Sequence, residues 1–289
     1  MKYKITGLLV LALVLIAVTL ISRTMPEDNG TRYIEHIMAE EKVPCSNHTS
    51  SELCSHLPIV KINTNGTEIP GKPIYDENFA ITGYTLAADG TTTIKATLDV
   101  VDNEKEYNHL TDIPQNMGDI MIRVRGHSSR RFEKANYFIR FINADGTNNA
   151  QEFLGMDAHH EWALHGPFLD KSLIRNYMCY NIAGEIMEYS PNVRFFELIL
   201  NGEYRGLYLA LETVTSGKEG ARLSLEVNKK DNTFSGYALR LDWGDTEEEN
   251  KIYPFTNYTT RAKNQHELVY PGTRNMTSEL KEAINNEFS

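Results

Sequence analysis

The sequence predicts an α+β fold in which a mostly antiparallel sheet is accompanied by a few helices. Short stretches of alternating apolar and polar residues, separated by turn signals, recur from Pro58 onward. Apolar residues at helical spacing occur in Leu173–Met187, a second helix begins at Thr277–Phe288, and one short helix is expected near Tyr33–Lys42. A third observation, an apolar run near the N-terminus, predicts a transmembrane helix in front of this fold.

The N-terminal run determines where we expect the protein to reside. Lys2 and Lys4 precede an apolar segment from Ile5 to Ile21, which approaches the roughly 20 residues that span a bilayer. No small-x-small cleavage pattern follows, so residues 1–22 are interpreted as a signal-anchor, with a cleaved signal peptide as the alternative. The prediction is a single-pass protein of the cell membrane, with its C-terminal domain outside the cytoplasm. Secretion is the alternative.

Charge and cysteine content narrow the possible partners. The formal net charge of −10 argues against nucleic acid, because phosphate backbones select basic surfaces. Residues 23–57 are interpreted as a polar stalk in which Cys45 and Cys54 flank a short loop. Outside the cytoplasm such a pair favours a disulfide, and two unrelated thiols are the alternative. No metal site is predicted, since no zinc spacing is matched by His159, His160 and His165.

The strands are predicted from period-two alternation. In Asp119–Arg125, the side chains of Ile120, Ile122 and Val124 point to one face and the residues between them to the other. Asn201-Gly202 supplies the tight turn of a hairpin. The remaining predicted strands are Ile59–Asn63, Thr92–Val100, Tyr137–Phe141, Phe195–Leu200, Tyr204–Leu211 and Gly236–Trp243.

A basic turn follows the strand that ends at Arg125. The segment Arg123–Arg131 gathers arginines around Gly126 and small hydroxyls such as Ser128, and Lys134 extends the same positive region. Backbone N–H groups at such a turn, with guanidinium groups beside them, suit phosphate oxygens. A solvated basic hairpin is an equal alternative. A Walker loop is excluded, because Gly-x4-Gly-Lys-Ser/Thr does not occur.

A dense polar segment precedes the first predicted helix. Asp170 is positioned to cap that helix, with Lys171 and Arg175 on its exposed face. The spacing from Asp170 to Asn176 is one residue longer than that of the acid and amide in a kinase catalytic loop. Capping is therefore the interpretation that the spacing favours.

A carboxylate closes the apolar strand that contains Leu207 and Leu211. Glu212 must be exposed there, or it must be partnered by a base such as Lys134. A Lys–Glu pair that orients a nucleotide and a simple rim carboxylate both fit this position.

Four blocks of the sequence together resemble the CotH type of spore-coat, kinase-like proteins. They correspond to an arginine-glycine-asparagine-serine-serine turn, a lysine-bearing return strand, a diagnostic central segment and a hairpin. In that order they are Met121–Arg130, Phe132–Tyr137, Trp162–Asn176 and Leu200–Glu212. The resemblance extends from about Leu57 to the C-terminus, so residues 58–289 are interpreted as a CotH-like domain.

The resemblance implies an atypical protein-kinase-like fold, ATP and Mg²⁺ as cofactors, and a protein substrate or coat protein as partner. Some family members transfer phosphate from ATP to serine of coat proteins. By the same resemblance Arg125, Ser128 and Lys134 approach the nucleotide phosphates. Lys171 and Arg175 support that site, and Glu212 pairs with a lysine or borders the nucleotide.

The sequence also departs from the family pattern. His127 and His165 stand where asparagines are usual, and Ala135 replaces one lysine of a pair. No Asp-x-Asp motif occurs, although the family holds its metal with such aspartates beyond the segment matched here. We therefore expect an incomplete gene product that is inactive as a kinase. The alternative is a non-catalytic cell-surface binding or structural module.

Overall fold

The computed structural model describes residues 32–46, 52–187, 189–217, 222–243, 264–272 and 276–287. The chain separates into two units, Met1–Thr31 and Arg32–Ser289, and the description below concerns the second. The predicted signal-anchor, residues 1–22, lies outside the described residues. No helix in the described ranges has the length and apolar character needed to cross a membrane.

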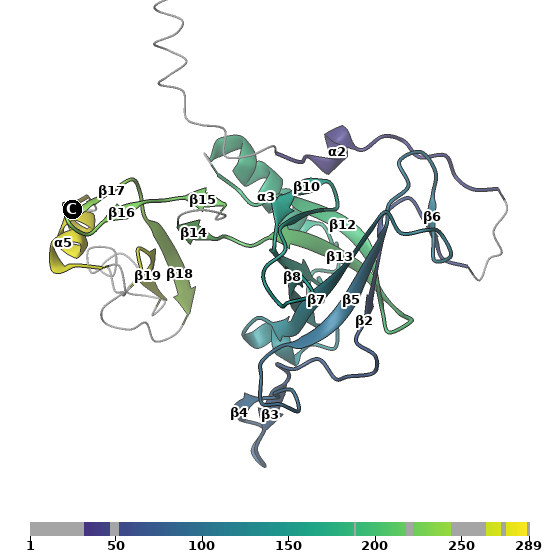
Figure 1. Ribbon diagram of the computed structural model, residues 1–289, viewed down its shortest axis with the longest axis horizontal. Coiled ribbons are helices and arrows are strands. Elements are labelled where there is room, and N and C mark those ends of the chain that lie inside the picture. The colour runs from purple at the N-terminus through teal and green to yellow at the C-terminus, as the bar shows by residue number, and fades with distance from the viewer. Residues whose placement is uncertain are drawn as a thin grey trace, which may run out of the picture. The chain divides into compact units, whose positions relative to one another are not determined.

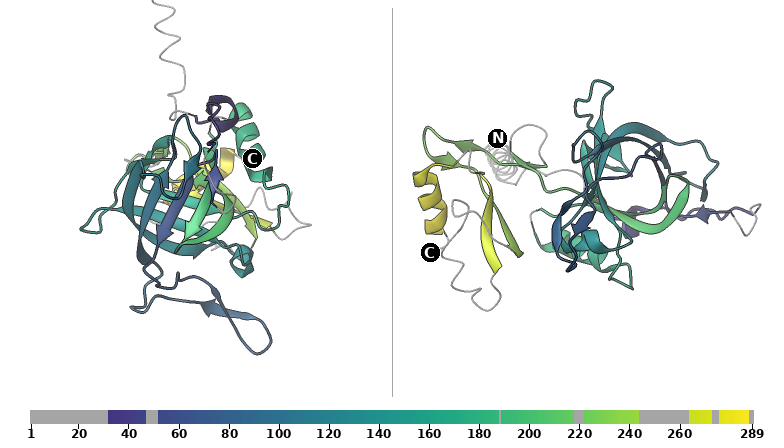
Figure 2. Two further views of the ribbon diagram at one scale, coloured as in Figure 1. Left: turned by 90° about the vertical axis from the view of Figure 1, so that its right-hand side faces the viewer. Right: turned by 90° about the horizontal axis from the view of Figure 1, so that it is seen from below.

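Seven strands form a closed barrel, which is seen along its axis in the right panel of Figure 2. Their order around the barrel is β11-β13-β12-β2-β5-β7-β8, and every neighbouring pair is antiparallel except β12 and β2. The strands are β2 (Ile59–Asn63), β5 (Ile94–Val101), β7 (Asn116–Arg125), β8 (Asn136–Ile142), β11 (Glu161–His165), β12 (Val193–Leu200) and β13 (Glu203–Glu212).

Alternation along each strand fills the barrel interior. Ile120, Ile122 and Val124 of β7 are buried, while the residues between them are partly exposed, as their spacing predicts. Trp162 and Phe196 reach the same interior from β11 and β12 and are fully buried. Burying one such side chain contributes about 1.5–3 kcal/mol. The barrel is therefore a packed core rather than a channel.

Short strand pairs and a few helices, labelled in Figure 1, complete the described fold outside the barrel. The pairs are β1 (Cys54–Ser55) with β6 (Asn108–His109), β3 (Pro73–Tyr75) with β4 (Ile81–Tyr84), β9 (Gln151–Phe153) with β10 (Met156–His159), β14 (Ser216–Gly217) with β15 (Leu223–Ser224), β16 (Val227–Asn228) with β17 (Thr233–Phe234), and β18 (Ala238–Trp243) with β19 (Asn264–Tyr270). The helices are α2 (Glu35–Met38), the short 3₁₀ helix η1 (Ser128–Arg131), α3 (Arg175–Ile186) and α5 (Ser278–Glu287).

The strand registers define two ends of the barrel. Arg125 pairs with Asn136, and β11 reaches the same end at His165, so these residues share one rim. Val101 and Asn116 lie at the opposite rim, because β5 and β7 run antiparallel. In Figure 1 the β3–β4 hairpin lies beside the first rim, and β6 lies beside the second.

The predicted α+β, kinase-like fold is wrong. The described part of the second unit is dominated by strands, and α3 packs outside the barrel against Val193 and Leu211. The individual strands and the helices near residues 175–186 and 278–287 are confirmed. What alternation does not show is closure, because an edge strand and a paired strand have the same period. Glu161–His165 joins β8 to β13 and closes the barrel.

Candidate functional site

The turn between β7 and β8 is folded tightly around a glycine. Gly126 adopts φ +109°, and a Cβ there would collide with the hydroxyl of Ser129, so only glycine fits without strain. The guanidinium of Arg130 donates to the carbonyl of Gly126 and to Gly71 O at 3.3 Å. It also lies 4.2 Å over the ring of Tyr84. The turn is thus bound to the β3–β4 hairpin.

A cavity of about 610 Å³ opens beside this turn. Four basic side chains line it, and the two acids of its lining are Glu68 and Glu133. Lys72 is bound by Glu68 at 2.9 Å, and Arg205 is bound by Glu203 at 2.7 Å. The basic residues are Lys72, Arg130, Arg131 and Arg205. The excess of cationic groups gives the cavity a positive character.

A second cationic group lies on the other side of the turn. Lys134 is half-buried with its ammonium 5.1 Å from the Tyr208 ring centroid; burial lowers its pKa, and the more distant charge of Glu197 opposes the shift. Burial also lowers the pKa of Arg125. The pKa of His165 is lowered first by burial and then by the charges of Arg125 and Lys134, while Asp170 opposes the shift. The structure therefore brings Arg125, Lys134 and His165 together; with the cavity above, they form what we call the basic end.

The segment after β11 covers this group closely. The Gly166 amide donates to Asn136 Oδ1 at 2.7 Å, and a Cβ on Gly166 would come within 2.9 Å of both Lys134 Cγ and Tyr208 Cε1. Phe168 then stacks on Phe132 of the basic turn at 4.9 Å. The close approach explains the glycine and places the polar segment against the turn.

The polar side chains of that segment act mainly on the helix. Asp170 accepts hydrogen bonds from the amides of Ser172 at 3.0 Å and Arg175 at 2.9 Å, and the Ser172 hydroxyl lowers its pKa most. It thus holds the first turn of α3 from outside the cap position, which Ile174 occupies. Arg175 is 75% exposed with Nε 3.6 Å from Asp170, and Lys171 donates to Phe168 O at 3.0 Å.

Of the two remaining predicted site residues, one belongs to the turn and the other stands apart from this group. Ser128 is exposed at the start of η1. Glu212 lies six residues along β13 from Gly206, the neighbour of Lys134, which is about 20 Å for an extended strand. Its carboxylate accepts from Asn192 N at 2.8 Å and lies 3.5 Å from Arg222 Nε. Arg222, rather than Lys134, is the base beside Glu212.

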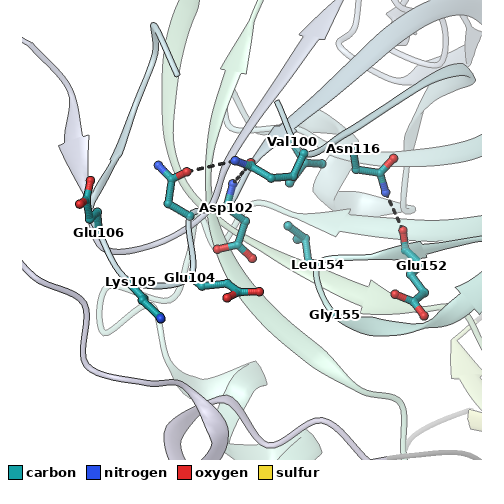
Figure 3. Close-up of a pocket in the computed structure, with 11 residues that line it drawn as sticks. Val100, Asp102, Glu104, Lys105, Glu106, Asn116, Glu152, Leu154 and Gly155 are labelled. Carbon is teal, nitrogen blue, oxygen red and sulfur yellow. Dashed lines mark hydrogen bonds between the residues drawn. The ribbon is translucent and has the colours of Figure 1, made fainter. Parts of the chain in front are cut away.

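The opposite rim carries a second cavity, of about 820 Å³, shown in Figure 3. Asn116 donates to the backbone carbonyl of Glu152 at 2.8 Å across its edge. Asp102 is bound by Lys42 at 2.9 Å and by Arg194 at 2.8 Å. We call this rim the acidic end, because its lining includes one lysine, Lys105, and four acids, Asp102, Glu104, Glu106 and Glu152.

The donor set of the basic end suits anions but not Mg²⁺. Mg²⁺ is held by carboxylate oxygens in proteins. Within the described residues, the one group of three or more potential ligands close enough to share an ion is Cys45, Cys54 and His109. The basic end therefore has cationic groups that suit phosphates, and its described residues form no cluster of three or more metal ligands.

Fold and site define a β-barrel domain with a cationic binding surface at one end. The chain belongs to the CotH kinase protein family, whose model matches residues 122–286, more than half of its length. Over 96 residues it is 32% identical to "Inner spore coat protein H" of Bacillus subtilis (strain 168). That match covers 33% of this chain and 24% of the relative. The sequence-based identification of the CotH family is confirmed.

The comparison also corrects the predicted location. A single-pass protein of the cell membrane does not agree with a relative that is named as a spore coat protein. The predicted location in the cell membrane is therefore wrong.

Sequence reasoning missed Lys72 and Arg205 as part of the basic end. Lys72 lies about 50 residues before the basic turn and Arg205 about 70 residues after it. The tight hairpin turn at Asn201-Gly202 was the available signal, because it delivers Arg205 to the rim where β12 ends and β13 begins.

Proposed function

We propose that the basic end of the barrel binds the phosphates of a nucleotide, with ATP as the nucleotide that the family resemblance implies. One observation carries the proposal. Arg125 and Lys134 are partly withdrawn from water, yet within the described residues neither has a carboxylate at ion-pairing distance. A desolvated cation without a counterion costs free energy, and a bound phosphate offsets that cost.

The surrounding residues support the same assignment. Arg130, Arg131, Lys72 and Arg205 line the adjoining cavity and raise the local concentration of anions. Ser128 and the backbone amides of the glycine turn offer neutral donors to phosphate oxygens. Lys171 and Arg175 are exposed, so we assign them a weak, long-range contribution.

Phosphate transfer to serine belongs to some proteins of the family, and a coat protein is the substrate that the resemblance implies. When bound, Mg²⁺ supplies charge stabilisation to such a transfer. The described residues at the basic end form no cluster of three or more ligands for it. We therefore assign binding and orientation of the phosphates to these residues, and no step of the transfer.

Isothermal titration of the chain with ATP, inorganic phosphate and adenosine tests the proposal. We expect ATP to bind more tightly than adenosine. We expect Lys134→Ala to lower the affinity for ATP about 10- to 100-fold, because the variant loses a charge-assisted hydrogen bond. Lys105→Ala, which removes an exposed lysine at the acidic end, is the matched control and leaves the affinity unchanged. Equal ATP affinities in the two variants would contradict the assignment.

We propose a protein-binding role in a coat as the second candidate, because α3 exposes an apolar stripe. Met178 and Ile182 are 48% and 55% exposed, and Ile174 and Ile186 continue the stripe at helical spacing. A fluorescent fusion carrying Met178→Lys and Ile182→Lys is expected to lose its coat localisation in a sporulating host. Retained localisation would reject this role, and the Lys134→Ala fusion is the control.

A further inference from the structure

A cysteine–histidine cluster lies outside the basic end, where β1 meets β6. The backbone builds it from three separate segments. Val43 pairs with Glu106 in a parallel bridge, which brings the segment ending at Cys45 beside residues 105–107. Cys54 lies directly opposite His109 in the β1–β6 pair. Directly opposed residues have Cβ atoms about 4.5–5.5 Å apart, so their side chains meet.

The three side chains converge on one point. Cys45 Sγ lies 3.2 Å from Cys54 Sγ and 3.0 Å from His109 Nε2. All three ligand atoms lie within 4.8 Å of one another. A tetrahedral zinc ion with Zn–S of about 2.3 Å and Zn–N of about 2.05 Å places S···S near 3.8 Å and S···N near 3.6 Å. An outward movement of roughly half an ångström therefore admits the ion.

The other nitrogen of the imidazole has the environment that metal-ligating histidines have. His109 Nδ1 faces Asp112 Oδ2 at 3.4 Å. That oxygen also accepts from the His109 amide at 2.9 Å and from Asn103 Nδ2 at 2.8 Å, which holds the carboxylate in place. A carboxylate beside Nδ1 favours the tautomer with its proton on Nδ1 and leaves the Nε2 lone pair directed at the sulfurs.

We propose that Cys45, Cys54 and His109 bind a zinc ion, with Asp112 orienting His109. Two thiolates and a neutral imidazole neutralise a divalent ion and suit zinc by softness. Each thiol releases its proton to solvent on coordination. All three residues are half-buried, so a water molecule completes the fourth position. The ion would fasten the segment before β2 to the connection between β5 and β7.

A disulfide between Cys45 and Cys54 is the competing occupant of this place. A disulfide needs sulfurs about 2.05 Å apart, and an imidazole at hydrogen-bonding distance takes no part in it. The position of His109 and its carboxylate is what favours the metal. The sequence does not reveal this, because His109 is separated from Cys54 by 54 residues.

The test is zinc and cobalt binding by the full chain, purified under reducing, chelator-treated conditions. We expect one equivalent of Zn²⁺ to bind and to raise the Tm by about 5 °C at saturation. Co²⁺ should show thiolate-to-metal charge transfer and the visible bands of a four-coordinate ion. The variants Cys45→Ser and Cys54→Ser should lose that charge-transfer band. Asp112→Asn should lower the affinity for zinc about tenfold.

Cys179→Ser is the matched control, because Cys179 is an exposed cysteine on α3, and it should bind both metals as the wild type does. The variants are compared by circular dichroism in the metal-free state, so that loss of binding is separated from loss of folding. The proposal is overturned if the reduced chain binds no zinc, or if binding survives Cys45→Ser combined with Cys54→Ser. It is equally overturned if mass spectrometry finds a Cys45–Cys54 disulfide formed in the presence of equimolar zinc.

Discussion

The two ends of the barrel differ in whether their buried charged side chains have ion-pair partners. At the acidic end Asp102 is held between Lys42 and Arg194, and Arg194 also lies 3.8 Å from Glu35. At the basic end Arg125 and Lys134 are partly buried, and no carboxylate of the described chain lies within ion-pairing distance of either. Paired buried charges hold segments together, whereas desolvated charges of one sign retain the capacity to bind a ligand. The comparison supports a structural role for the acidic end and the phosphate-binding role that we propose for the basic end.

The largest expected effect comes from breaking the network of the acidic end. Arg194→Ala leaves Asp102 and Glu35 with a weaker set of partners in a site where Arg194 is 10% exposed. We expect a loss of about 3–5 kcal/mol in the free energy of unfolding, measured by urea denaturation. Arg175→Ala, at a 75% exposed arginine, is the control and should stay within about 0.5 kcal/mol of wild type. A loss below about 1 kcal/mol in Arg194→Ala would show that this network is not structural.

Glu212 distinguishes a structural role from a binding role, because the sequence allowed it either to border the nucleotide or to pair with a base. Glu212→Ala removes the partner of Arg222 and the acceptor of the Asn192 amide, so the stability should fall by about 2–3 kcal/mol. ATP affinity should be unchanged in the same variant. A weaker ATP affinity at equal folded fraction would place Glu212 in the binding site and contradict its assignment to a structural ion pair with Arg222. Glu104→Ala, at an exposed acid, is the stability control.

A smaller effect is expected at the turn of the basic end. Gly126→Ala places a side chain at φ +109° against Ser129, which costs about 1–3 kcal/mol of strain. Because the same turn positions Arg125 and Arg130, ATP binding should weaken as well. Gly83→Ala meets no atom within 4 Å and should change neither quantity. Unaltered thermal stability in Gly126→Ala would mean that the turn relaxes freely.

The smallest expected effect is a pH dependence. Burial and the charge of Arg125 lower the pKa of His165 below its ordinary 6.5, so the folded protein favours the neutral imidazole. The unfolded chain binds the proton more readily, and stability is therefore fully present above pH 6.5 and decreases as the pH falls through the folded pKa. His165→Gln should flatten this part of the stability profile, measured by urea denaturation at a series of pH values. Phosphate binding should raise the pKa of His165, which NMR titration detects; an unshifted pKa at saturation would contradict its place beside the ligand.

The local structure of this protein could be predicted from residue patterns. Ile120, Ile122 and Val124 mark a buried face because period two is a property of the strand alone. The Asn201-Gly202 turn is likewise local, since two residues with positive φ suffice to reverse the chain. The four blocks that identify the CotH family are also read directly from the order of residues.

The basic end could be predicted only in part. The sequence found Arg125, Ser128 and Lys134 because they are neighbours along one turn. It did not find Lys72 and Arg205, and it paired Glu212 with the wrong base, because the chain after β13 folds back so that Arg222 binds Thr213 and lies beside Glu212. The polar segment from Gly166 to Arg175 passes close to Lys134 at Gly166, and its aspartate binds the first turn of the helix.

By itself the sequence determined the family, the individual strands and helices, and the positive turn, all of which depend on short-range patterns. Tertiary structure alone decided that the sheet closes into a barrel, which rim each charge occupies, and that His109 meets Cys45 and Cys54. The physical reason is that closure, register and burial depend on pairing between distant segments. A charge therefore becomes a structural ion pair or a binding group only according to what the fold places beside it.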